Sequence, residues 1–154
     1  MSDAIDALSA SSSVLVVDWP SQDVPDSLAR AGYQVFVKGG PGPRDYSIRE
    51  RRGSEVVARP ATEPPDHIDL VYSHRPLSEL AGIAAMAARL GAHTVWRQSG
   101  RSGPGTGDPK GCWVSEQETQ EGRSLVEAEG LSYIDDVYIG DAVRELAASR
   151  ETGS

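Results

Sequence analysis

The sequence predicts an α/β fold in which helices cover both faces of an open, doubly wound parallel sheet of about five strands. The first observation lies in residues 68–96, where an apolar run, an Ala-rich amphipathic segment and a second apolar run follow one another. This is the order and length of a βαβ unit, whose two strands lie parallel because a crossover helix joins them. The second observation is that apolar runs alternate with helical patterns elsewhere in the chain, which extends the arrangement into a three-layer domain.

The first expected strand is residues 14–17, a continuous run of Val and Leu typical of a central strand that is buried on both faces. A helix over residues 24–31 should follow, with Asp23 as a suitable N-cap and Gly32 just past its end. Residues 33–37 have the composition of the second strand.

Residues 38–53 are expected to form an irregular loop, because glycine and proline punctuate them. This segment is the basic patch of an acidic chain, and its first residue, Lys38, stands at the end of the second strand. A cation there suits a phosphorylated ribose, as in CoA or NADP, whereas a solvated loop is the other interpretation. Residues 56–58 are expected to be a short edge strand.

The βαβ unit supplies the next elements: a strand over 68–72, a helix over 77–90 that Gly91 ends, and a strand at 94–96. Residues 97–113 form a second Gly-rich loop.

The remaining elements complete the pattern. Ser115 and Glu118 have the spacing of a capping box, so a helix should run from there to Glu129, with Gly130 as its stop. A last strand at 132–134 and a final helix over 139–148 follow.

The strand order expected for this pattern is 3-2-1-4-5, with the order reversing between the first and fourth strands. Ligands of such sheets bind at the carboxyl ends of the strands beside this point, and the rule selects a set of loop residues as the binding site. The candidate binding residues are Asp18, Trp19, Pro20, Ser21, Lys38, Gly39, Ser73, His74, Arg75, Gln98 and Gly100.

Length and charge bear on the domain organisation and limit the function classes. We expect residues 1–12 to be flexible or a short helix, residues 13–146 to form one domain and residues 147–154 to be a flexible tail. The net charge of −8 over 154 residues disfavours broad contact with nucleic acid or an anionic membrane. No stretch approaches the length of a membrane span, and a single cysteine, Cys112, suits a reducing cytoplasm.

Several short sequence motifs in the chain are typical of a known protein family. They include Ala31-Gly32-Tyr33, Arg75-Pro76 at a helix start, Val95-Trp96-Arg97-Gln98-Ser99-Gly100, and Glu129-Gly130-Leu131 before the last strand. In these the chain resembles the small single-domain CoA-binding family, a Rossmann-like module related to the nucleotide-binding domain of the succinyl-CoA synthetase α-subunit. The resemblance covers about residues 14 to 146 and implies CoA or acyl-CoA as ligand. The segment Asp18–Asp23 departs from the family's glycine-containing phosphate loop, because it is shorter, acidic and without glycine.

No motif for catalysis or metal binding is present: the chain has no P-loop, no nucleophile elbow and no G-x-G-x-x-G, and its three histidines lack ligand spacing. The first hypothesis is therefore a non-catalytic protein that binds CoA or acyl-CoA, a nucleotide-type small molecule. The second is a degenerate module that has lost its ligand and acts through protein contacts, for example as a homodimer. The weakest is an NADP-linked enzyme.

Overall fold

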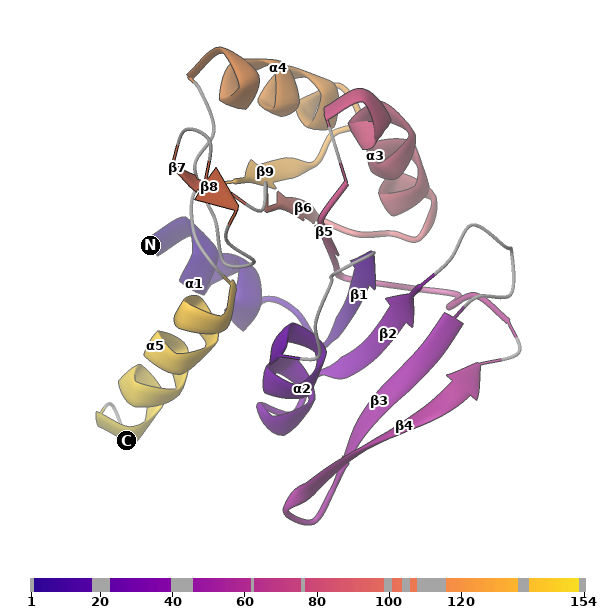
Figure 1. The fold of residues 1–154 in the computed structure, drawn as a ribbon, viewed down its shortest axis with the longest axis vertical. Coiled ribbons are helices and arrows are strands. Elements are labelled where there is room, and N and C mark those ends of the chain that lie inside the picture. The colour runs from indigo at the N-terminus through magenta and orange to yellow at the C-terminus, as the bar shows by residue number, and fades with distance from the viewer. Residues whose placement is uncertain are drawn as a thin grey trace.

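The computed structural model confirms the α/β class and shows a mixed, mostly parallel sheet of seven strands in the order β4-β3-β2-β1-β5-β6-β9 (Figure 1). The structure describes residues 2–17, 23–39, 46–61, 63–75, 77–98, 101–103, 106–107, 116–135 and 139–152.

The centre of the sheet is parallel, as the sequence predicts. Strand β1 (Ser13–Val17) pairs with β2 (Gln34–Lys38) on one side and with β5 (Leu70–Ser73) on the other. Strand β6 (Thr94–Arg97) continues the sheet beyond β5, and β9 (Ser132–Ile134) forms its edge. All five residues of β1 are buried, because the strand has neighbours on both sides and helices on both faces.

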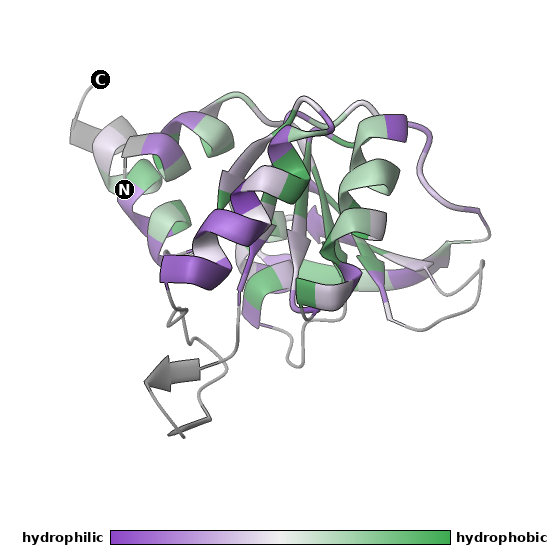
Figure 2. Cartoon of the chain, turned by 90° about the horizontal axis from the view of Figure 1, so that it is seen from above, coloured by the Kyte–Doolittle hydropathy of each residue, from purple (hydrophilic) through white to green (hydrophobic). Residues whose placement is uncertain are grey.

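One face of the sheet is covered by α1 (Ser2–Ser9), α2 (Asp23–Arg30) and α5 (Ile139–Thr152). Their apolar residues, such as Leu8 and Leu28, share a buried core with Tyr72 and Trp96 of the sheet. The hydrophobic strands run between the helical layers in Figure 2. Helix α5 extends four residues past the predicted end at Ala148, to Thr152.

The opposite face carries α3 (Leu80–Arg89), which follows a 3₁₀ turn at Leu77–Glu79, and α4 (Glu116–Glu127). The turn and α3 together span the predicted helix. The residues after the two helices, Gly91 and Gly130, have φ angles of +83° and +80°, which confirms that glycine ends each helix in the left-handed conformation.

The predicted order 3-2-1-4-5 and the prediction of an all-parallel sheet of about five strands are wrong. On the β2 side of the sheet the structure has two antiparallel strands instead. Strand β3 (Tyr46–Arg52) occupies much of the predicted irregular loop, and β4 (Glu55–Ala61) is a longer edge strand than predicted. Both are antiparallel to their neighbours. The strand was missed because Ser-Ile-Arg-Glu-Arg-Arg has few apolar residues, and pairing with β2 and β4 stabilises it instead.

The second predicted loop, residues 97–113, also contains strands. They are β7 (Arg101–Gly103) and β8 (Thr106–Gly107), which pair as an antiparallel hairpin separate from the main sheet.

A carboxylate joins the amino ends of β1 and β5. Asp69 Oδ2 accepts hydrogen bonds from the main-chain N–H groups of Ser12 (2.7 Å) and Ser13 (3.2 Å), and Asp69 Oδ1 lies 2.7 Å from His67 Nε2. Burial alone would raise the pKa of Asp69, but the bonds from Ser12, His67 and Ser13 outweigh burial and lower it. The carboxylate therefore stabilises the folded state only while it is ionised.

We predict that Asp69→Ala lowers the free energy of unfolding by about 1–3 kcal/mol at pH 7, because two main-chain donors lose a charged acceptor. The folded-state pKa is depressed, so this stabilisation is present above the unfolded pKa of about 3.9 and is lost as pH falls further. Urea unfolding at several pH values checks this, with the exposed Asp66→Ala as control. A difference between Asp69→Ala and wild type that stayed constant down to about pH 2 would contradict the assignment.

Candidate functional site

The candidate site lies where the carboxyl ends of β2, β1, β5 and β6 meet at one edge of the sheet. In the register of the strands, Val17 stands beside Lys38 on one side and beside Ser73 on the other, and Ser73 stands beside Arg97. The structure thus brings together the predicted residues Lys38, Gly39, Ser73, His74, Arg75 and Gln98. The other predicted residues, Asp18, Trp19, Pro20, Ser21 and Gly100, lie outside the described residues.

Main-chain hydrogen bonds fix the rim of this edge. The N–H of His74 donates to the carbonyl of Val17 at 3.1 Å, and the N–H of Gln98 donates to the carbonyl of Ser73 at 2.9 Å. His74 Nδ1 lies 3.1 Å from the carbonyl oxygen of Gln98. Because a carbonyl only accepts, this contact requires the ring proton on Nδ1. The rim is therefore a continuation of the sheet's hydrogen-bond ladder beyond the strand ends.

Two cations stand on the rim, and both have neighbours. Lys38 Nζ lies 5.3 Å from the centre of the Tyr46 ring, a cation–π distance. Arg75 forms an ion pair with Glu79 one helical turn later, and its side chain is 37% exposed. The N–H of Arg75 also donates to Ser73 Oγ at 3.1 Å, so the serine caps the turn. Lys38 and Arg75 thus lie at the carboxyl ends of β2 and β5, on the two sides of β1.

The position of Gln98 at a strand end suggests a side chain that faces a ligand, but its environment is different. Its side chain is fully buried, and its Oε1 accepts a hydrogen bond from the hydroxyl of Tyr72 at 3.0 Å. The amide thus contributes to the packing beneath the rim.

The arginines of the basic segment that the structure describes do not lie beside Lys38. Lys38 pairs with Tyr46, but the antiparallel register carries β3 away, so that Arg49 stands beside Val35 near the amino ends of the strands. Arg49 forms an ion pair with Asp26 at 3.1 Å, and Arg51 donates to the main-chain carbonyls of Gly53 and Arg30. Hydrogen bonds and salt bridges within the hairpin and α2 therefore engage these side chains.

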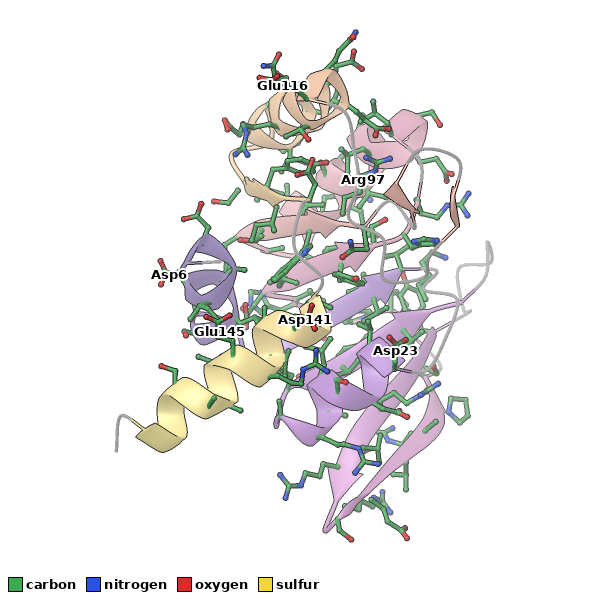
Figure 3. All side chains as sticks on the ribbon, turned by 60° about the vertical axis from the view of Figure 1, so that its left-hand side comes forward. Asp6, Asp23, Arg97, Glu116, Asp141 and Glu145 are labelled. Carbon is green, nitrogen blue, oxygen red and sulfur yellow. The ribbon has the colours of Figure 1, made fainter. Side chains whose placement is uncertain are left out.

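Sequence reasoning missed a buried polar cluster around Arg97. The side chain of Arg97 is only 5% exposed; its Nε donates to the carbonyl of Arg75 at 3.1 Å, and its Nη2 lies 3.3 Å from Glu118 Oε1 of α4. Figure 3 labels Arg97 near α4. The available signal was a charged residue inside an otherwise buried strand, and such a residue requires partners.

Tyr133 and Asp135 complete this cluster beneath α4. Three of its buried atoms, Arg97 Nη1, the Tyr133 hydroxyl and Asp135 Oδ2, have no hydrogen-bond partner among the described residues. Burial, with the nearby charge of Asp135, raises the pKa of Tyr133, and the charge of Arg97 opposes that rise. The tyrosine therefore stays protonated, so it is a hydrogen-bond donor rather than a base at neutral pH.

Within the described residues, no group of three His, Cys, Asp or Glu side chains could hold a metal ion. Likewise, none of the helices in that part of the chain is long and apolar enough to cross a membrane.

The fold and the converging strand ends define the class of the protein, a Rossmann-like α/β domain with its rim at the carboxyl edge of the sheet. A family model described as "CoA binding domain" matches residues 14–140, and the chain belongs to this family. The resemblance in the sequence is thereby confirmed.

Two solved structures share the fold. The crystal structure of Prb, described as the PH1109 protein redesigned for binding, has a TM-score of 0.61 and 17% identity over 95% of this chain and 91% of that one. The structure of cell-free ID.343 from Thermus thermophilus has a TM-score of 0.56 and 18% identity, over 94% and 97%. No curated protein matches the chain in sequence.

Tyr133 packs against Gly122 of helix α4 and leaves no room for a larger side chain there. A Cβ added at Gly122 would lie 2.6 Å from the Tyr133 hydroxyl, whereas one added at Gly82 of α3 would meet no atom within 4 Å. Alanine normally stabilises a helix interior by about 1 kcal/mol relative to glycine. We predict that Gly82→Ala raises the free energy of unfolding by up to about 1 kcal/mol, and that Gly122→Ala lowers it by about 1–3 kcal/mol.

Denaturant unfolding of both variants measures this difference in sign. Stabilisation by Gly122→Ala equal to that by Gly82→Ala would mean that Tyr133 does not pack against Gly122.

Proposed function

We propose that the protein is a non-catalytic module that binds CoA or an acyl-CoA at the carboxyl edge of its sheet. The observation that carries the proposal is the convergence of Lys38, Ser73 and Arg75 at the point where the strand order reverses, in a chain of the CoA-binding-domain family. Ligands of doubly wound sheets bind at this point. The pantetheine arm would enter between β1 and β5, with the phosphates on the side of β2.

Lys38 is the residue that would recognise the ribose phosphate. It ends β2, where dinucleotide-binding sheets that take a free ribose carry an acidic residue instead. A cation there favours a phosphorylated ribose. Since the pairing of β3 takes Arg49 and Arg51 toward the amino ends of the strands, Lys38 is the cation of this segment that the described register leaves at the rim.

The non-catalytic part of the proposal is supported by the polar side chains of the rim and of the buried cluster beside it. The pKa of Tyr133 is raised, which disfavours the tyrosine as a base, and Arg75 is paired with Glu79. His74 Nδ1 contacts the main-chain carbonyl of Gln98 at 3.1 Å, so this ring nitrogen donates to a neutral main-chain acceptor.

One sequence observation favours the alternative, a module that acts through protein contacts. The segment Asp18–Asp23 carries acidic residues and no glycine, and acidic side chains oppose a pyrophosphate at the end of the first strand. A CoA-binding module is stabilised by CoA, whereas a module that acts through protein contacts alone is not, so one ligand experiment separates the two functions.

We predict that CoA stabilises the protein by about 5–10 °C in thermal unfolding at about a hundredfold excess over its Kd. Lys38→Met should weaken CoA binding about tenfold in calorimetry and leave 3′-dephospho-CoA binding nearly unchanged, because the lost ion pair is with the ribose phosphate. Arg89→Met, at the far end of α3, is the matched control and should change neither affinity.

No stabilisation by CoA, acetyl-CoA, NADP or ATP at millimolar concentration would reject ligand binding and leave the protein-contact function. Equal weakening of CoA and 3′-dephospho-CoA by Lys38→Met would instead reject the placement of the ribose phosphate at Lys38.

A further inference from the structure

The two edges of the main sheet are built differently. At one edge β4 carries Pro60, which lacks an N–H, together with the charged residues Glu55 and Arg59. Proline and charge are devices that prevent another strand from pairing with an edge. At the other edge β9 is Ser-Tyr-Ile and has neither. The β9 edge is therefore the one that can accept a further strand.

A groove of about 550 Å³ lies along β9. Ser132, Tyr133 and Ile134 of β9 form its floor. Ala7 of α1 and Ala10, just after that helix, line one wall, and Glu127 of α4 lines the other. Figures 1 and 3 show β9 between these two helices, with Asp6 labelled on α1 and Glu116 on α4. The small alanine side chains leave room above the strand for the side chains of a further strand.

The main chain of Tyr133 faces this groove. The N–H of Ser132 donates to the carbonyl of His93 at 2.9 Å, so the main chain of Ser132 points to β6. Residues two apart along a strand point their main-chain groups to the same side. The N–H and C=O groups of Ile134 therefore point to β6, and those of Tyr133 point to the opposite side of β9. Strand β9 has no neighbour on that side within the part of the chain that the structure describes.

The groove has acidic walls. Asp3 and Asp6 on α1 and Glu127 on α4 line it and are exposed. Arg123 also lines it, with its guanidinium 5.9 Å from the centre of the Tyr133 ring and 4.0 Å from Glu127. The ring nitrogens of His93, another lining residue, contact the hydroxyls of Ser11 and Thr94. Three carboxylates against one engaged arginine favour a cationic occupant.

A second copy of this chain is a poor occupant for two reasons. Its own β9 lies on the floor of an equivalent groove between two helices, so two such strands cannot approach each other closely enough to pair. Each copy also brings the same acidic walls and a net charge of −8, which repel.

We propose that β9 is a docking edge for a short, extended and basic peptide segment of a partner protein, which adds an eighth strand to the sheet. The segment donates to and accepts from the main chain of Tyr133, and its Lys or Arg side chains meet Asp3, Asp6 and Glu127. Alternate apolar side chains contact Ala7 and Ala10. This inference does not depend on a ligand at the carboxyl edge.

The probe is a fluorescein-labelled peptide of alternating lysine, valine and threonine, with a second peptide in which alternate main-chain nitrogens are methylated. We expect the first peptide to bind saturably in fluorescence anisotropy and to slow hydrogen exchange of the Tyr133 amide, with no effect on the Ala87 amide in α3. The methylated peptide should bind about tenfold more weakly, because it cannot complete the strand ladder.

Protein variants test the charges. The double change Asp6→Lys and Glu127→Lys should weaken peptide binding about five- to tenfold, because exposed ion pairs contribute up to about 1 kcal/mol each. The charge-matched control, Glu55→Lys with Glu63→Lys, lies away from the groove and should bind like wild type.

Three results would overturn the proposal: no binding at about 1 mM peptide, equal binding of the methylated peptide, or binding that leaves the exchange of the Tyr133 amide unchanged. Slow exchange of that amide without peptide, together with a dimer in light scattering, would show that a second copy fills the groove instead.

Discussion

The position of β1 between β2 and β5 is the constraint on which the rest of the structure depends. Its five residues are buried, and hydrogen bonds join it to a neighbour on each side. At its amino end the Asp69 carboxylate accepts from Ser12 and Ser13, and at its carboxyl end the Val17 carbonyl accepts from His74. The rim of the candidate site is thus part of the same ladder that builds the core. A change that loosens the central strand would therefore change the site as well.

The antiparallel hairpin of β3 and β4 after β2 determines where the basic residues of segment 38–53 lie. A helical crossover would have returned the chain to the amino edge of the sheet to begin another parallel strand, whereas β3 begins beside the carboxyl end of β2 and pairs directly with it. It carries the arginines along β3, where Arg49 pairs with Asp26 of α2. The described basic residues of segment 38–53 are consequently separated in space, and of these Lys38 stays at the rim.

The sequence predicted the parallel strands and most helices well, because each has a strong local pattern. The apolar run before Asp18 and the βαβ unit are examples, and the helix stops at Gly91 and Gly130 are backbone requirements of single residues. It failed at Tyr46–Arg52, since β3 alternates between apolar and polar residues only over its first four positions and ends in Glu-Arg-Arg, and its partners supply the stability. The eleven candidate residues were predicted from topology alone, and the six that the structure describes lie at the carboxyl edge of the sheet.

By itself the sequence determined the α/β class, the central parallel strands and the family, because periodicity and short strings are local properties. Only the tertiary structure decided that Arg97 is buried against Glu118 and near Tyr133, and that Gln98 packs on Tyr72. It also decided that β9 has one neighbour, β6, among the strands that the structure describes. These features depend on which residues from distant segments meet. A charged or polar side chain is stable in a buried position only when such partners are present, and no local pattern specifies them.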